Sequence, residues 1–225
     1  MIIDIIQAQD GMEQLFDVFY DNIPKYSGKL GRFSALETFS LRNRTQKINL
    51  TGAFALPSPL DMVPMIYIFG RPKILHFCYC QNGMRRLGTI GCYEVGIRKA
   101  HHRIIDASGR KFHAYHFSDG GYEYLPIYLD DVTQVAVIEA TPLTAEGSRS
   151  RYKLYILDDY RDCADIFSMY VMYFANWYDT KRLRSKPKKN TVDKKSAVSY
   201  IDKFDREWLA KNFPKTDPEE DSEIR

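Results

Sequence analysis

The sequence predicts an α+β fold in which a closed, antiparallel β-barrel of about ten strands surrounds a hydrophobic helix. Short apolar runs set between turn residues occupy most of the chain, which is typical of strands joined by hairpins. Residues 86–158 contain no helical segment, and parallel βαβ units would need one at each crossover, so the sheet is expected to be antiparallel. Residues 163–178 are apolar almost all round a helix, and such a helix needs cover on most sides.

The strands are predicted where β-branched and aromatic residues are concentrated, and aromatic residues make up 14% of the chain. Gly, Asn, Asp and Ser stand at the connections, as in Gln81-Asn82-Gly83 and Ala107-Ser108-Gly109, where tight hairpins need positive φ angles. The predicted strands are residues 35–41, 48–56, 65–69, 73–80, 86–95, 101–107, 110–117, 122–129, 133–143 and 152–158.

Two amphipathic helices are predicted outside these strands. Apolar residues at three- and four-residue spacing predict a short N-terminal helix over residues 11–22, which ends before Pro24. Similar spacing from Tyr200 to Phe213 predicts a C-terminal helix over residues 199–213. We expect the apolar face of this second helix to dock on the barrel; binding to a membrane or to a partner is the alternative.

The helix over residues 163–178 could lie in a bilayer or in the protein interior. Asp162 is a candidate N-cap, and the clearly polar side chains within the helix are Asp165, Ser168 and Asn176. A membrane span needs about 20 apolar residues, whereas this segment offers about 16. We therefore expect no transmembrane segment, and we expect the strands to curl round the helix, which also removes exposed sheet edges.

The bulk properties are those of a globular protein, since 44% of the 225 residues are hydrophobic and 27% are charged. A formal net charge of +3 is too small to indicate nucleic acid, and no nucleic-acid partner is expected. The first residues lack the features of a secretory signal, so we expect a cytoplasmic protein that can associate with a membrane peripherally. Its cysteines are then expected to be reduced and buried; they are Cys78, Cys80, Cys92 and Cys163.

These patterns divide the chain into five predicted segments. They are an N-terminal helical segment (1–34), the barrel with its central helix (35–180), a basic linker (181–198), the C-terminal helix (199–213) and an acidic tail (214–225).

The order of the elements resembles the tubby C-terminal-like superfamily, which includes tubby domains, phospholipid scramblases and LURP-one-related proteins. The residues that carry the likeness are the hairpin Asp106-Ala107-Ser108-Gly109-Arg110-Lys111 and the segment YKLYILDDYRDCADIF, followed by the aromatic run. The tail YIDKFDREWLAKNF looks like that of uncharacterised bacterial members.

The resemblance covers residues 65–180, while residues 1–64 have no counterpart in it. It implies a closed barrel of about twelve strands threaded by a hydrophobic helix. Tubby domains bind phosphoinositides and scramblases are linked to lipid movement and calcium. None of their ligand residues matches a position of this chain, so no site is transferred.

No catalytic or cofactor motif is present, because the chain lacks GxGxxG, GxxxxGK[ST], GxSxG and HExxH. We predict a non-enzymatic protein with no cofactor and no metal. The alternative is a small metal-dependent enzyme that uses His76, His113 or His116 with nearby cysteines. Against it, His76, Cys78 and Cys80 alternate along one strand, where side chains two residues apart stand about 6–7 Å apart, too far to share one ion unless the strand bends.

The remaining histidines and an acidic run have ordinary explanations. His101 and His102 point to opposite faces of a strand, so only one of them could join His113 or His116. The aspartates at 158, 159, 162 and 165 lack the spacing of a calcium loop, and helix capping with a favourable charge at a helix N-terminus accounts for them.

The strongest surface signal is basic: residues 181–195 hold eight basic residues and one acid. Near an anionic membrane each such side chain contributes about 1 kcal/mol, although nucleic acid attracts the same charges and a solvated linker needs no partner. We hypothesise a module that binds anionic lipid head groups, such as phosphoinositides or phosphatidylserine, with a protein-interaction scaffold as the alternative. The candidate lipid-binding residues are Arg98, Lys99, Arg103, Arg110, Lys111, Lys181, Arg182, Arg184, Lys186, Lys188 and Lys189.

Overall fold

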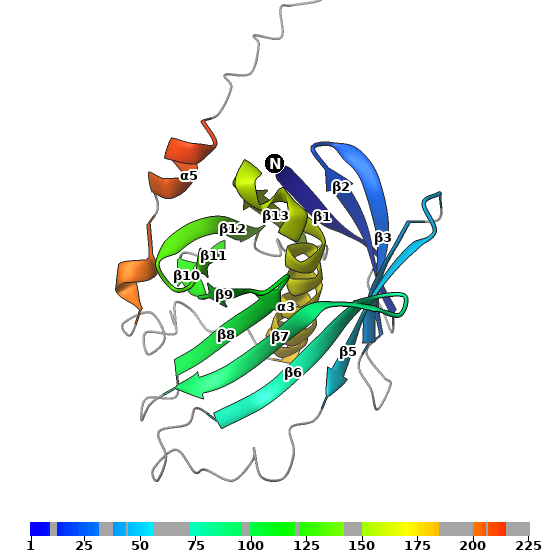
Figure 1. The fold of residues 1–225 in the computed structure, drawn as a ribbon, viewed down its shortest axis with the longest axis horizontal. Helices are drawn as coiled ribbons and strands as arrows, with labels where there is room; N and C mark the ends of the chain where they lie inside the picture. The colour runs from blue at the N-terminus through cyan, green and yellow to red at the C-terminus, as the bar shows by residue number, and fades with distance from the viewer. Residues whose placement is uncertain are drawn as a thin grey trace, which may run out of the picture.

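The computed structural model describes residues 1–9, 13–31, 38–43, 45–55, 73–95, 100–119, 122–141, 150–184, 200–205 and 207–214, and its strands form one closed antiparallel barrel (Figure 1). Twelve strands make the ring, which closes because β9 pairs with β8 on one side and with β11 on the other. Short β10 continues the line of β9 along β11. The strands are β1 (Ile2–Gln9), β2 (Glu13–Tyr20), β3 (Ile23–Gly31), β4 (Thr38–Asn43), β5 (Ile48–Ala55), β6 (Lys73–Asn82), β7 (Arg85–Val95), β8 (Ala100–Ala107), β9 (Arg110–Ala114), β10 (Phe117–Asp119), β11 (Tyr122–Leu129), β12 (Thr133–Thr141) and β13 (Arg151–Ile156).

The closed antiparallel barrel predicted from the sequence is confirmed. The strands predicted at 35–41, at 48–56 and from residue 73 onward overlap observed strands, although β9 and β10 divide the one predicted at 110–117. The strand predicted at 65–69 lies outside the described residues.

The predicted N-terminal helix over residues 11–22 is wrong, because residues 13–20 form β2. Burial alternates along this strand, with Gln14, Phe16 and Val18 facing the interior. The strand ends at Asp21 and Asn22, whose φ angles of 47° and 66° make the two-residue turn that pairs Tyr20 with Ile23. Apolar residues at 15, 16 and 19 imitated helical spacing, and the barrel begins at Ile2 rather than at residue 35.

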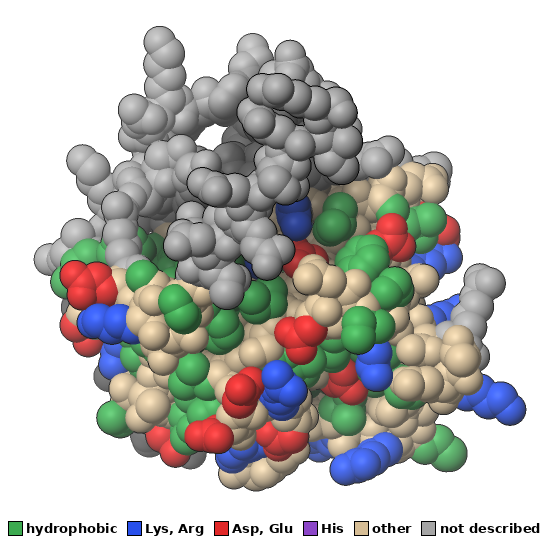
Figure 2. Space-filling model, turned by 90° about the horizontal axis from the view of Figure 1, so that it is seen from above, with side chains coloured by type: hydrophobic (Ala, Val, Ile, Leu, Met, Phe, Trp, Pro, Cys, Tyr) green, Lys and Arg blue, Asp and Glu red, His purple; other side chains and the backbone are tan. Residues whose placement is uncertain are grey.

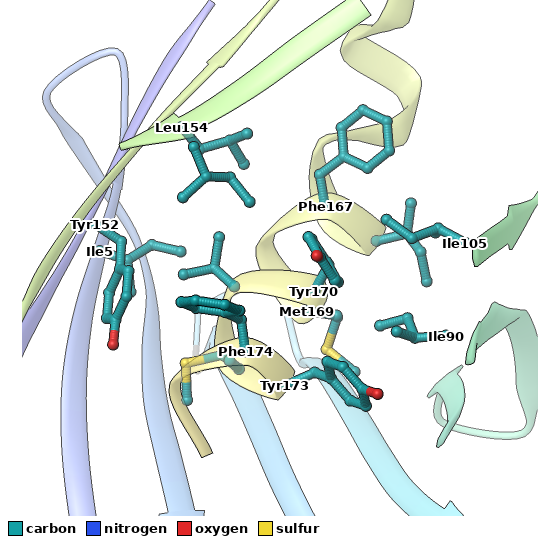
Figure 3. Packing of buried hydrophobic residues seen from close by; sticks show 14 of the residues in the cluster. Ile5, Ile90, Ile105, Tyr152, Leu154, Phe167, Met169, Tyr170, Tyr173 and Phe174 are labelled. Carbon is teal, nitrogen blue, oxygen red and sulfur yellow. The ribbon is translucent and has the colours of Figure 1, made fainter. Parts of the chain in front are cut away.

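The barrel encloses a helix. After the 3₁₀ turn η1 (Asp158–Cys163), α3 (Ala164–Arg184) runs through the interior, and from Ala164 to Ala175 every side chain except Asp165 is buried. Figure 3 shows Phe167, Tyr170 and Phe174 between inner-wall residues on opposite sides, among them Leu154 and Ile105. No helix in the described part of the chain is long and apolar enough to cross a membrane.

The first turns of α3 carry two polar side chains that find partners on the wall. The hydroxyls of Tyr20 and Tyr26 donate to Asp165 Oδ1 at 2.9 and 3.0 Å, and Tyr20 Oη lies 3.0 Å from Ser168 Oγ. Burial raises the pKa of both tyrosines and the Asp165 carboxylate raises it further, so both phenols remain protonated donors at neutral pH. These bonds fix the rotation of the helix inside the barrel.

The central helix is longer than predicted. It extends to Arg184 instead of ending near residue 178, so the predicted linker over 181–198 begins as helix. Lys, Leu and Arg are good helix formers, and positive charge near a helix C-terminus is favourable. The rest of that linker, residues 185–198, lies outside the described residues.

The C-terminal segment lies against the outside of the barrel, but not as the single helix predicted over 199–213. It contains the short turn η2 (Ile201–Lys203) and α5 (Glu207–Asn212), separated at Asp205, whose Oδ1 accepts hydrogen bonds from two backbone N–H groups at the start of α5. Tyr200 and Phe204 pack on a small second core formed by Tyr115, Phe117 and Tyr128.

Candidate functional site

Five hairpin turns lie at one end of the barrel, because every second connection of an antiparallel meander falls at the same end. We call this end the hairpin rim; its turns are residues 21–22, 45–47, 83–84, 108–109 and 130–132. Three neighbouring turns carry or adjoin basic residues, namely Lys47, Arg85, Arg86, Arg110 and Lys111. The other two carry Asp21, Asp130 and Asp131. We call the first three turns the basic part of the rim; in the other two turns the aspartates lie near cations, Asp21 3.9 Å from Arg161 and Asp131 3.2 Å from Lys203. On the face shown in Figure 2 the basic, acidic and hydrophobic side chains are interspersed.

A groove of about 400 Å³ lies in the basic part of the rim, between residues 86–89 of β7 and residues 106–111 of the β8–β9 hairpin. We call it the hairpin groove. Arg86, Arg110 and Lys111 line it together with one carboxylate, Asp106, which accepts a hydrogen bond of 3.3 Å from Thr89 Oγ1. Pockets for small ligands usually hold about 300–1,000 Å³, so the groove has room for one compact anionic group.

Arg110 is held in place at one side of the groove. Its guanidinium pairs with Asp162, lies 3.0 Å from Cys163 Sγ and stands 5.7 Å from the ring centres of both Phe112 and Tyr160. Burial raises the pKa of the Cys163 thiol to about 11, although Arg110 opposes the rise. Cys163 is therefore a protonated thiol at neutral pH and a poor nucleophile.

The other two cations of the groove are exposed. The Arg86 guanidinium lies 5.2 Å from the ring centre of Tyr79, a cation–π contact that restricts its motion. Lys111 follows Arg110 on β9, and its side chain is open to solvent. Arg86 and Lys111 therefore line the groove with exposed side chains, whereas the Arg110 guanidinium is turned towards Asp162, Cys163 and Tyr160 at its edge.

A second group of polar residues lies inside the barrel, at a break in the wall. β9 ends at Ala114, and β11 has Pro126 opposite the break, where the missing N–H of proline leaves no donor unpaired. His116, which follows the break, places Nε2 2.5 Å from Oε2 of Glu123, whose side chain is 1% exposed. The His116 ring also meets Phe174 of α3, with ring centres 5.2 Å apart.

Arg103 belongs to this interior group and not to an outer surface, so its prediction as a lipid-binding residue is corrected. It lies on the same side of β8 as the buried Ile105 and Ala107, and its Cζ stands 5.6 Å from the ring centre of Phe174. Its Nη1 is buried and has no hydrogen-bond partner among the described residues. Burial raises the pKa of the neighbouring Tyr170 to about 12, and the Arg103 cation opposes this rise.

The predicted basic residues do not form one surface. Arg110 and Lys111 lie in the hairpin groove, beside the start of α3, whereas Lys181, Arg182 and Arg184 lie in its last turns. A helix of 21 residues is about 30 Å long, which places these two groups at opposite ends of the barrel. Arg98, Lys99, Lys186, Lys188 and Lys189 lie outside the described residues.

Arg86 lines the groove but was not among the residues predicted from the sequence. A signal was present, because Arg85 and Arg86 directly follow the turn at Gly83 and Met84, and basic residues beside a hairpin turn are exposed. Arg110 and Lys111 also directly follow a hairpin turn, so the same position beside a turn could have identified all three basic residues of the groove.

The histidines proposed for a metal site do not converge. His113 lies on the outer face of β9, where burial lowers its pKa and Asp131 raises it, whereas His116 faces the interior. No three His, Cys, Asp or Glu side chains lie close enough to hold a metal within the part of the chain that the structure describes. The side chains of His76, His101 and His102 are outside that part. All four cysteines are free and buried, as predicted.

Comparisons with known proteins add no assignment: no family model, no curated protein and no solved structure matches the chain. The fold defines the class of protein as a closed antiparallel barrel with a helix inside.

Proposed function

We propose that the protein is a non-enzymatic module that binds anionic lipid head groups at a membrane surface. The observation that carries the proposal is the hairpin groove, a space of about 400 Å³ whose lining residues include Arg86, Arg110 and Lys111. The resemblance of residues 65–180 to the tubby C-terminal-like superfamily favours the same ligand class, because tubby domains bind phosphoinositides.

The composition of the groove suits a phosphorylated head group. Arginine presents a planar fork of N–H donors that matches two phosphate oxygens, and lysine adds a mobile charge. Because the contact with Tyr79 already restricts Arg86, this side chain loses little entropy on binding, whereas Arg110 is paired with Asp162 and contributes mainly its charge. Asp106 provides an acceptor for a hydroxyl or ammonium group of the ligand.

The backbone also permits close approach. Gly109 has a φ of 75°, and no heavy atom lies within 4 Å of the position a Cβ would take there. A phosphate can therefore come near the main chain of the turn without a steric clash.

Sedimentation with vesicles tests the proposal. The full chain should sediment with phosphatidylcholine vesicles that contain phosphatidylserine or phosphoinositides, and rising salt should release it. Retention no greater than on pure phosphatidylcholine would reject the proposal.

A matched pair of variants separates the groove from general charge. Lys111→Ala should weaken retention severalfold, because Lys111 lines the groove. Lys153→Ala removes the same charge from β13, where Lys153 lies against Tyr155, and should leave retention unchanged. Equal loss in both variants would contradict a specific role for the groove.

A further inference from the structure

The turn between β6 and β7 carries an apolar side chain that does not pack against the rest of the protein. Met84 is 104% exposed, the largest value among the exposed large hydrophobic side chains of the described residues. Single exposed apolar residues are common and need no explanation by themselves. Met84 differs because Arg85 and Arg86 follow it directly and Arg86 lines the hairpin groove.

We propose that this turn is a membrane anchor: Met84 inserts into the lipid layer while the hairpin groove holds a head group. The inference rests on the proposed function and adds to it the lipid bilayer itself as partner. It predicts that the protein distinguishes a head group in a bilayer from the same head group in solution.

The turn holds its tip in a fixed position. Gly83 adopts a φ of 58°, and its N–H donates to the carbonyl oxygen of Asn49 at 3.2 Å, which ties the turn to β5. Asn82 and Arg85 form the last pair of the hairpin, so Met84 projects from a closed ladder. A fixed tip loses little conformational entropy on insertion.

The register of the strands gives the reach of Met84. Gly88 pairs with Ala107, so the turn at 108–109 lies beside Leu87, three residues short of Met84 along β7. Three residues span about 10 Å of strand, or about 8 Å along the axis of a barrel whose strands tilt by about 40°. The head-group layer of one leaflet is about 5–8 Å thick, so a head group in the groove places Met84 at the edge of the hydrocarbon.

Charge selects which part of the rim meets the membrane. Arg85 and Arg86 are exposed beside Met84 and would lie in the head-group layer, where phosphates attract them. Ile23 is also an apolar residue beside a rim turn and is 69% exposed, but its turn carries Asp21, which lies 3.9 Å from Arg161, and has no pair of basic residues beside it. The two adjacent arginines give the first turn a local excess of positive charge that the second turn lacks.

Two matched substitutions test the insertion. Met84→Glu should weaken binding to phosphatidylserine-containing vesicles about tenfold, because it replaces apolar burial with repulsion. Ile23→Glu, of the same kind and at the same end of the barrel, should change vesicle binding less than about twofold. Both sites are exposed, so thermal melting of each variant should match that of the parent chain.

Binding of soluble inositol trisphosphate separates the anchor from the groove. Met84→Glu should bind this probe as the parent does. If the parent binds both the probe and vesicles, and Met84→Glu binds vesicles equally well, then the proposal that Met84 inserts is rejected and the proposal that the groove binds head groups is kept. If the parent binds the probe but does not bind vesicles, the proposal that Met84 inserts is also rejected. If the parent binds neither, the proposed function fails, and the anchor that rests on it fails with it.

Direct evidence can come from Met84→Cys labelled with an environment-sensitive fluorophore. The native cysteines are buried, so the label goes to the new site. The emission should shift to the blue on adding anionic vesicles, and brominated acyl chains should quench it. If the vesicles sediment the protein but the emission spectrum does not change, Met84 does not insert into the lipid. That result would also be expected if a protein partner, and not lipid, covered Met84.

Discussion

The centre of the barrel and its hairpin rim place similar residues in opposite surroundings. Phe167 in α3 is 0% exposed, whereas Met84 at the rim is 104% exposed. Arg103 lies against the Phe174 ring inside the barrel, whereas Arg86 lies against Tyr79 outside it. Buried contacts contribute to the free energy of unfolding, and exposed side chains are available to ligands. Substitutions at the centre should therefore reduce stability, and substitutions at the rim should reduce binding alone.

The largest effect is expected at Phe167. Its ring meets Phe112 of β9 edge-on, with ring centres 5.1 Å apart, and no part of it reaches solvent. Phe167→Ala removes this burial and leaves a cavity, which should cost about 3–5 kcal/mol of unfolding free energy in urea titrations. Val132→Ala, at a rim residue that is 79% exposed, is the control and should change it by less than about 0.5 kcal/mol. Equal costs would contradict the division between centre and rim.

A smaller effect is expected at the polar start of α3. Asp165→Ala removes the acceptor of the Tyr26 hydroxyl and leaves Tyr20 with Ser168 alone, at a cost of about 1–3 kcal/mol. Combined with Tyr26→Phe, the loss should be less than additive, because the two variants remove the same hydrogen bond. Additive losses would show that Asp165 does not hold the helix through Tyr26.

Acid should loosen the C-terminal segment by a still smaller amount. Burial alone would raise the pKa of Asp131, but hydrogen bonds from Tyr115 and Lys203 outweigh it and lower the pKa below 3.8. The Asp131 carboxylate therefore stabilises the folded state fully at pH values above its pKa in the unfolded chain. This stabilisation is lost as the pH falls through the lower pKa that Asp131 has in the folded protein. Because 44% of the Asp131 side chain is exposed and solvent screens its charge, the loss should stay below about 1 kcal/mol.

Hydrogen exchange of the docked segment, residues 200–205, measures this change between about pH 5 and pH 2. Asp131→Asn should remove the pH dependence while keeping the side chain similar in shape. An unaltered pH profile in that variant would assign the effect to other carboxylates.

Much of the barrel could be predicted because its strands carry local signals. Turn residues and alternating apolar residues located the strands from residue 73 onward. The all-round apolar surface of residues 163–178 predicted a buried helix, and its side chains are buried from residue 166 to residue 175. The N-terminal strands were missed because the apolar spacing in β2 also fits a helix. The turn at Asp21 and Asn22 decides between the two, and its positive φ angles appear only in the structure.

The site was harder to predict, because it depends on which face of a strand each residue occupies. Arg103 shares its face of β8 with the buried Ile105, but an arginine is rarely buried, so the pattern alone left open whether this side chain faces inward. Its partners Phe174 and Tyr170 come from a helix about 70 residues later in the chain, and no local pattern reports such contacts. The separation of Arg110 from Arg184 likewise follows from the course of α3 through the barrel.

The double variant Arg86→Ala with Lys111→Ala tests most directly whether the rim binds lipid independently of the stability of the fold. Vesicle sedimentation and urea unfolding should be measured on the same preparation. We predict that binding to anionic vesicles falls at least about tenfold while the unfolding free energy changes by less than about 0.5 kcal/mol. Undiminished vesicle binding, or a loss of stability comparable with that of Phe167→Ala, would contradict the account.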